Sequence, residues 1–112
     1  MSKKNKALPF FHEYFEEWIE LYKVGAVRQV TLQKYYMSHQ RIIELVPHLK
    51  MNELNRRSYQ TLLNRYAVTH EKQTTMDFHH QLKGAILDAV DEGLIDNNPT
   101  RKIIIKGKDP RT

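Results

Sequence analysis

Six histidines are the side chains in this sequence best suited to binding a metal ion. They are His12, His39, His48, His70, His79 and His80. A zinc site on one helix pairs two histidines about four residues apart with an acidic residue, and no pair here has that spacing; the adjacent His79 and His80 would point about 100° apart. His39 falls on the apolar side of a predicted helix and is expected to be a hydrogen-bonded core residue. The sequence therefore predicts no metal and no other cofactor.

Covalent catalysis also lacks its usual residues. The chain has no cysteine, no Gly-x-Ser-x-Gly turn and no glycine-rich phosphate loop, and Ser38 and Ser58 both fall within predicted helices. The acidic residues of segments 9–23 and 74–92 lie on solvent faces, where they need no catalytic role. At 112 residues the chain is expected to be one domain, too short for most two-lobed enzymes. We expect no enzymatic activity from it.

Positive charge is concentrated in parts of the chain. Eighteen Lys and Arg against thirteen Asp and Glu give a net charge of +5. Segments 31–73 and 99–112 each carry +4, whereas segments 9–30 and 74–98 carry −2 and −4. Such striping fits either solvated surface or a phosphate-binding surface made by the middle of the chain and its tails. The lack of cysteine, of a membrane-spanning apolar run and of an apolar leader predicts a cytoplasmic protein that contacts no membrane.

Two helical segments carry the candidate DNA-binding side chains. The polar face of one predicted helix presents Lys34, Ser38 and Arg41, and the start of another presents Lys72, Gln73, Thr74 and Thr75. Free backbone N–H groups and the positive dipole end of a helix favour phosphate oxygens, and the side-chain amide and hydroxyls could also reach base edges. The alternatives are a solvated face for the two cations and simple helix capping for the threonine at position 74.

Four amphipathic helices position these residues. Helix-period apolar positions run over 9–23, from a Thr31 N-cap to Pro47, from an Asn55 N-cap to 66, and from a Thr74 N-cap to a Gly93 stop. The buried positions predicted for the first helix are Phe11, Tyr14, Phe15, Trp18, Leu21 and Tyr22. No long alternating segment predicts a strand, so we expect an all-α bundle. Ile103, Ile104 and Ile105 either start an edge strand or pack on the bundle as a tail.

The order of motifs resembles the core-binding domain that precedes the catalytic domain in phage-type tyrosine recombinases, the phage integrases. The matching elements are Phe15-Glu16-Glu17-Trp18, Thr31-x-x-x-Tyr35, Ile43-x-x-x-Pro47-x-Leu49, Leu54-Asn55-x-x-x-Tyr59-Gln60, and Ala89-Val90-Asp91-Glu92-Gly93-Leu94-Ile95-Asp96-Asn97-Asn98-Pro99. The last element is the most specific, and the resemblance covers nearly the whole chain.

The resemblance implies a four-helix, SAM-like orthogonal bundle with basic N- and C-terminal tails. It implies that residues 9–99 are a site-specific DNA-binding domain for the core recombination site, used in DNA integration and recombination, that 1–8 are a basic tail, and that 100–112 are a basic linker to an absent catalytic domain. Its implied partners are double-stranded DNA and that catalytic domain, and its implied DNA-binding set adds His79 to the seven residues named above. The alternative function is a helical protein-interaction domain that uses the acidic faces of the first and fourth helices.

Overall fold

The computed structural model describes residues 9–108, in which the regular elements are helices joined by short connections. They are α1 (Phe11–Tyr22), α2 (Gln29–Leu45), the short 3-10 helix η2 (Met51–Glu53), α3 (Arg56–Ala67) and α4 (Lys72–Asp91). Within residues 9–108 extended pairing is limited to two isolated bridges, and the predicted all-α class is confirmed. The predicted basic tail 1–8 lies outside the described residues, as do residues 109–112 of the predicted linker.

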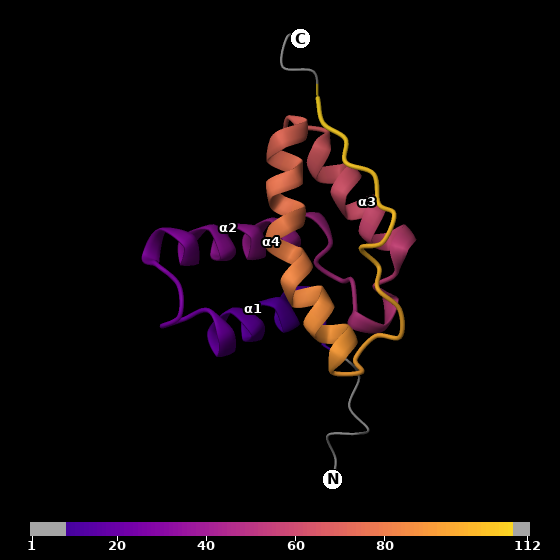
Figure 1. The fold of residues 1–112 in the computed structure, drawn as a ribbon. Coiled ribbons are helices and arrows are strands. Elements are labelled where there is room, and N and C mark those ends of the chain that lie inside the picture. The colour runs from indigo at the N-terminus through magenta and orange to yellow at the C-terminus, as the bar shows by residue number, and fades with distance from the viewer. Residues whose placement is uncertain (1–8, 109–112) are drawn as a thin grey trace.

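The helices form two pairs that cross (Figure 1). α1 and α2 run antiparallel, α4 crosses both of them, and α3 lies beside the N-terminal part of α4. This arrangement confirms the predicted orthogonal four-helix bundle. None of the helices in residues 9–108 is both long and apolar enough to cross a membrane. The core takes Phe11, Phe15 and Ile19 from α1, Ile42 from α2, Tyr59, Leu62 and Leu63 from α3, and Leu82, Ala85 and Ile86 from α4.

α1 buries the face that its apolar spacing predicts, except in its last turn. Leu21 and Tyr22 are predicted to be buried, but 67% of Leu21 and 50% of Tyr22 are exposed. This turn extends past the crossing with α4 toward the α1–α2 loop, so α4 does not cover it (Figure 1). Nearer the crossing, the Trp18 ring packs on Gly84 of α4, where a β-carbon would lie only 3.3 Å from the ring.

Two predicted helix ends are confirmed by their capping bonds. At the start of α3, Asn55 Oδ1 accepts a hydrogen bond of 3.0 Å from the backbone N–H of Ser58. At the end of α4, Gly93 has a φ of +78°, and its N–H donates to Val90 O at 3.0 Å. The N–H of Leu94 donates at 2.9 Å to the carbonyl five residues earlier. These two bonds around a left-handed glycine make a Schellman motif, which the sequence pattern anticipates.

The starts of α2 and α4 correct the predicted caps. Both helices begin three residues earlier than predicted, with Arg28 and Glu71 rather than Thr31 and Thr74 at the N-cap positions. Each of these N-cap residues has an extended backbone and makes no side-chain capping bond. Because neither residue type is a preferred cap, the sequence pattern favours the next threonine along the chain instead.

The chain after α4 returns alongside α3 as a packed tail (Figure 1). Gln60 of α3 binds both backbone groups of Ile104: its Nε2 donates to the carbonyl O and its Oε1 accepts from the N–H, each at 2.8 Å. Ile103 and Ile105 pack against the core, whereas 60% of Ile104 is exposed. Of the two predicted roles of this isoleucine segment, edge strand or packed tail, the structure shows the packed tail.

The tail reaches the start of α4 and accounts for its early beginning. The N–H of Lys108 donates to His70 O at 2.9 Å, and Lys108 forms an isolated parallel bridge with Glu71. Gly107 lies so close to the backbone of Lys72 that there is no room for a β-carbon. This pairing holds Glu71 in the extended conformation that an N-cap residue requires, although its side chain does not cap the helix.

Candidate nucleic-acid interface

A hollow of about 530 Å³ lies between α2 and the N-terminal half of α4. It is lined by Lys34, Met37, Ser38 and Arg41 of α2, by Tyr66 and His70 at and beyond the end of α3, and by Thr74, Asp77, Phe78, His80 and Gln81 of α4. Four of the eight predicted DNA-binding residues, at positions 34, 38, 41 and 74, therefore line one concave surface. The fold brings them together from two helices that are far apart in the sequence.

α2 presents its three predicted residues on one side. Lys34, Ser38 and Arg41 are separated by four and three positions, so they share a helix face. Lys34 is exposed, and it forms no ion pair with any residue in the described range. Ser38 is only 7% exposed and lies in the floor of the hollow. Arg41 is half-buried and pairs with Glu44 at 3.1 Å, which offsets part of its charge.

The first turn of α4 supplies polar groups beside the hollow. Lys72, Gln73 and Thr74 are exposed, and the unpaired N–H groups of a first helical turn favour an anion. Gln73 Nε2 donates to Asp77 Oδ1 at 3.1 Å, so its amide is held by a neighbouring carboxylate. Gly107 of the tail packs against Lys72, so the chain itself covers one side of this helix entrance.

Two of the eight residues predicted to bind DNA are buried in the core, which corrects the predicted DNA-binding set. Thr75 is fully buried, and its hydroxyl donates to Glu71 O at 3.1 Å. His79 is 6% exposed, and its Nδ1 is hydrogen-bonded to Tyr59 Oη at 2.7 Å. Burial lowers the pKa of His79 to about 4, with nearby positive charges as lesser causes. The imidazole is therefore neutral at pH 7, and neither side chain belongs to the surface of the hollow.

An aromatic stack forms one wall of the hollow, and sequence reasoning missed its outer member. The rings of Phe78 and Tyr66 lie 4.1 Å apart at an interplanar angle of 13°, and those of Tyr66 and His70 lie 3.9 Å apart at 2°. His70 also bonds the carbonyl of Tyr66 through Nδ1 at 2.9 Å. The four-residue spacing of Tyr66 and His70 is the available signal, but His70 lies beyond the end of α3, and the sequence indicates it only as a candidate metal ligand.

His39 is predicted to be a core residue, and it lies half-buried between α1 and α2. Its Nε2 lies 4.0 Å from Glu16 Oε1, and burial lowers its pKa. The predicted hydrogen bond is absent at Nε2, which is buried without a partner among the described residues. In the same part of the chain, no three His, Asp or Glu side chains lie together as metal ligands would.

Two solved integrase structures share this fold. The crystal structure of the N-terminal domain of the prophage pi2 protein 01 (integrase) from Lactococcus lactis matches with a TM-score of 0.83 and 32% identity, over 88% of this chain and 93% of that chain. The chain belongs to the phage integrase N-terminal domains. The solution NMR structure of a phage integrase fragment from Staphylococcus saprophyticus matches the integrase domain with a TM-score of 0.72 and 30% identity, over 85% and 86% of the two chains. No protein-family model and no curated protein matches.

The segment that most resembles the integrases, residues 89–99, does not line the α2–α4 hollow. It supports the fold of this integrase domain instead. Gly93 ends α4, Ile95 is 7% exposed, and Pro99 is fully buried. These residues turn the chain from α4 into the tail that packs along α3. The predicted family is confirmed, and the specific Gly-Leu-Ile and Asn-Asn-Pro elements are explained by the turn they form.

Proposed function

We propose that this integrase domain binds duplex DNA at the core recombination site through the α2–α4 surface. This surface consists of Lys34, Ser38, Arg41, Lys72, Gln73 and Thr74. The observation that carries the proposal is the hollow between α2 and α4, where a phage integrase domain gathers two cations and two hydroxyls from two helices beside the first turn of α4. Such donors bind phosphate oxygens and position a protein on a duplex.

The two helices have different roles in the proposed interface. Lys34 and Arg41 contact phosphates, and Arg41 exchanges its pairing with Glu44 for a phosphate when DNA binds. Gln73 gives up its hydrogen bond to Asp77 and reads a base edge, since a side-chain amide can pair bidentately with adenine. Replacing either cation then weakens binding to all sequences, whereas Gln73→Ala mainly relaxes sequence preference.

The proposed domain is a non-catalytic part of a site-specific tyrosine recombinase. It holds the DNA, while a catalytic domain elsewhere in the parent protein cleaves and rejoins the strands. Residues 9–99 form the DNA-binding unit, and residues 100–112 are the linker toward that partner domain. The proposal places the protein in the cytoplasm, where its DNA target is accessible.

The test is a fluorescence-anisotropy titration of a short mixed-sequence duplex with the 112-residue chain over a range of salt concentrations. About six phosphate contacts predict a log–log slope near −5, at ~0.9 per phosphate. Lys34→Ala/Arg41→Ala should reduce the magnitude of the slope by about 2. The matched control, Arg28→Ala/Lys50→Ala, removes the same charge from exposed positions outside the α2–α4 surface and should leave the slope nearly unchanged.

The alternative, a protein-interaction domain, predicts the opposite pattern. Its acidic surface includes Glu13, Glu16 and Glu20, which are exposed along α1. Reversing these charges would abolish partner binding in that account, while Lys34→Glu and Arg41→Glu would leave it intact. Absence of DNA binding, or binding without salt dependence, would exclude the DNA-binding proposal.

A further inference from the structure

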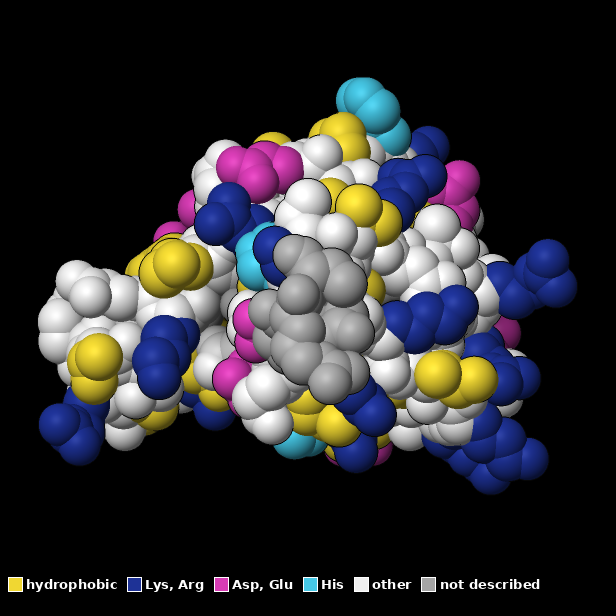
Figure 2. All heavy atoms as spheres, turned by 90° about the horizontal axis from the view of Figure 1, so that it is seen from above, with side chains coloured by type: hydrophobic (Ala, Val, Ile, Leu, Met, Phe, Trp, Pro, Cys, Tyr) yellow, Lys and Arg dark blue, Asp and Glu magenta, His cyan; other side chains and the backbone are white. Residues whose placement is uncertain are grey.

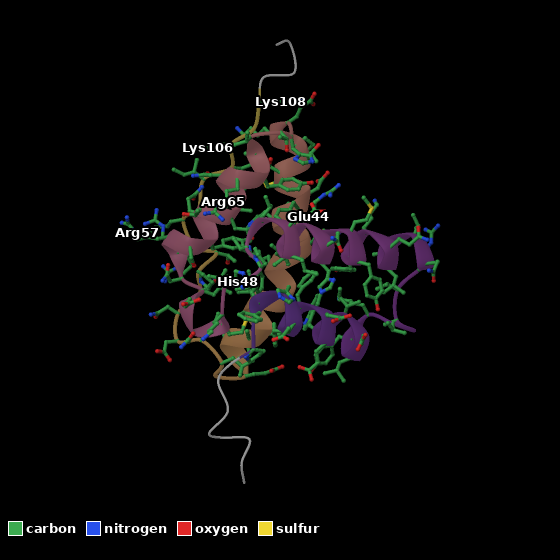
Figure 3. All side chains as sticks on the ribbon, turned by 180° about the vertical axis from the view of Figure 1, so that it is seen from behind. Glu44, His48, Arg57, Arg65, Lys106 and Lys108 are labelled. Atoms are coloured by element: carbon green, nitrogen blue, oxygen red, sulfur yellow. The ribbon has the colours of Figure 1, made fainter. Side chains whose placement is uncertain are left out.

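The packed tail and α3 together make a second basic surface. We name it the α3–tail surface and define it by Arg56 and Arg57 of α3 and Arg101, Lys102 and Lys106 of the tail. Figure 2 shows Lys and Arg side chains gathered on the side of the molecule formed by α3 and the tail. Seen from behind, Arg57 and Lys106 both project from this edge (Figure 3). Figures 1 and 3 place α3 between most of the tail and α2, so this surface lies apart from the α2–α4 surface except where Gly107 packs on Lys72.

The tail is held so that its cationic side chains point outward. In an extended segment, alternate residues face opposite sides. Ile103 and Ile105 pack inward on the core, so Ile104 and Lys106 face solvent. The two hydrogen bonds from Gln60 to Ile104 fix this register. A one-residue shift would expose two isoleucines and bury a lysine, which is unfavourable.

Arg56 and Gly107 secure the two ends of the tail. Arg56 Nη2 donates to Lys102 O at 3.0 Å, where Lys102 adopts a left-handed backbone with φ +59°. At the other end, Gly107 meets the backbone of Lys72 too closely to admit a side chain. The basic residues of the tail are therefore carried on a segment anchored at both ends and in the middle. They are presented at defined positions relative to α3.

On this surface one acid, Asp96, lines a hollow together with Arg56, Arg101 and Lys102, but no acid lines the groove beside Arg57 and Lys106. Among the described residues, no ion pair involves any of its five cations. A groove of about 330 Å³ between α3 and the tail is lined by Arg56, Arg57, Gln60, Thr61, Ile104 and Lys106, three cations and no acid. The lining of the α2–α4 hollow, by contrast, contains two cations and Asp77. The second groove is thus the more positive of the two concave surfaces.

We infer that the α3–tail surface is a second binding surface for duplex DNA phosphates. The inference rests on the proposed DNA-binding function and extends it. A row of cations with little base-reading chemistry suits the phosphate backbone, which is recognised through charge and without sequence preference. Gln60, the main amide of the groove, is committed to the tail and is not free to read bases. The α2–α4 surface positions the protein on its site, and the α3–tail surface adds sequence-independent affinity.

The test compares salt dependence of duplex binding for Arg57→Ala/Lys106→Ala with the matched control Arg28→Ala/Lys50→Ala in the 112-residue chain. The first pair should reduce the magnitude of the log–log slope by about 2, at ~0.9 per phosphate, with the same effect on every duplex sequence. The control pair should leave it nearly unchanged. Equal slopes for Arg57→Ala/Lys106→Ala and the control pair would overturn the inference. In that case, a reduced slope for Lys34→Ala/Arg41→Ala would still support the proposed function.

A second, charge-neutral variant tests the role of tail packing. Gln60→Ala removes both hydrogen bonds to Ile104 without changing the net charge. It should weaken duplex binding and reduce the slope by about 1, because one tail lysine is no longer held in place. Circular dichroism should show unchanged helix content. If Gln60→Ala binds as the unmodified chain does while Arg57→Ala/Lys106→Ala is impaired, the cations bind DNA without the tail being docked, and that part of the inference is wrong.

Discussion

Tyr59 and His79 are joined by a hydrogen bond of 2.7 Å between Oη and Nδ1, which links α3 to α4 inside the core. Burial raises the pKa of Tyr59 and lowers that of His79 to about 4. The pair is therefore stable with a neutral phenol and a neutral imidazole. A predicted DNA-binding histidine is instead part of what holds the helices together.

The protonation of His79 predicts acid-sensitive stability. Its folded pKa of about 4 is below the ordinary value of 6.5, so the unfolded chain takes up the proton first. The contribution of neutral His79 to the free energy of unfolding is complete above pH 6.5. It is lost as the pH falls toward 4 and amounts to about 3 kcal/mol. Urea unfolding across this range should show the decrease, and His79→Leu should show a smaller one. An unchanged decrease in His79→Leu would contradict this assignment.

The starts of α3 and α4 predict different losses of stability when the residue predicted as the N-cap is replaced. Asn55→Ala should lower the free energy of unfolding by about 1 kcal/mol, because Asn55 accepts the hydrogen bond from Ser58 N. Thr74→Ala is the matched control and should change it by less than about 0.5 kcal/mol, since Thr74 lies within α4. Chemical denaturation measures both values. A similar loss in Thr74→Ala would place the start of α4 where the sequence pattern predicts it.

The Schellman turn predicts a conformational cost at Gly93. Gly93→Ala should destabilise the domain by about 1 kcal/mol, because a β-carbon disfavours the φ of +78°. No described atom lies within 4 Å of the added carbon, so a steric clash does not contribute. Gly93→Asn should cost less, since asparagine tolerates this conformation better. Thermal unfolding of the two variants measures the difference, and equal costs would argue against a backbone origin.

The link between α1 and α4 through Trp18 predicts a specific effect at Asp88. Trp18 Nε1 donates to Asp88 Oδ2 at 2.7 Å, a short hydrogen bond to a carboxylate. Asp88→Ala should cost about 2 kcal/mol of stability, because the indole N–H loses its acceptor. Asp91→Ala, an exposed acid one turn later, is the control and should cost less than about 0.5 kcal/mol. Urea denaturation of the two variants decides whether the cost is local to the Trp18 bond.

Local signals explain which parts of the fold could be predicted. The Asn55 cap and the Gly93 stop depend on residues within a few positions, and both were found from the sequence. The starts of α2 and α4 were missed because Arg28 and Glu71 carry no cap signal. For α4 the cause is long-range, since Glu71 is held by Lys108 of the tail.

The candidate site was predicted less completely than the fold. A polar helix face visible in the sequence selects Lys34 and Arg41, and the structure places them beside Thr74, although their role in DNA binding stays a prediction. Thr75 and His79 were assigned to the surface, although both are helix-spaced with buried Leu82 and could have been placed inside. The α3–tail surface could not be predicted, because no local sequence pattern specifies that the tail packs along α3.

The most direct test of the proposed function is an NMR titration of the isotope-labelled 112-residue chain with a short mixed-sequence duplex. Backbone amide shifts report which residues meet DNA without any substitution. We expect the largest shifts over positions 34–41 and 72–81, further shifts at the α3–tail surface, and little change along the acidic face of α1. Shifts confined to that acidic face, or no shifts at DNA concentrations well above the ~10⁻⁴ M limit of non-specific binding, would contradict it.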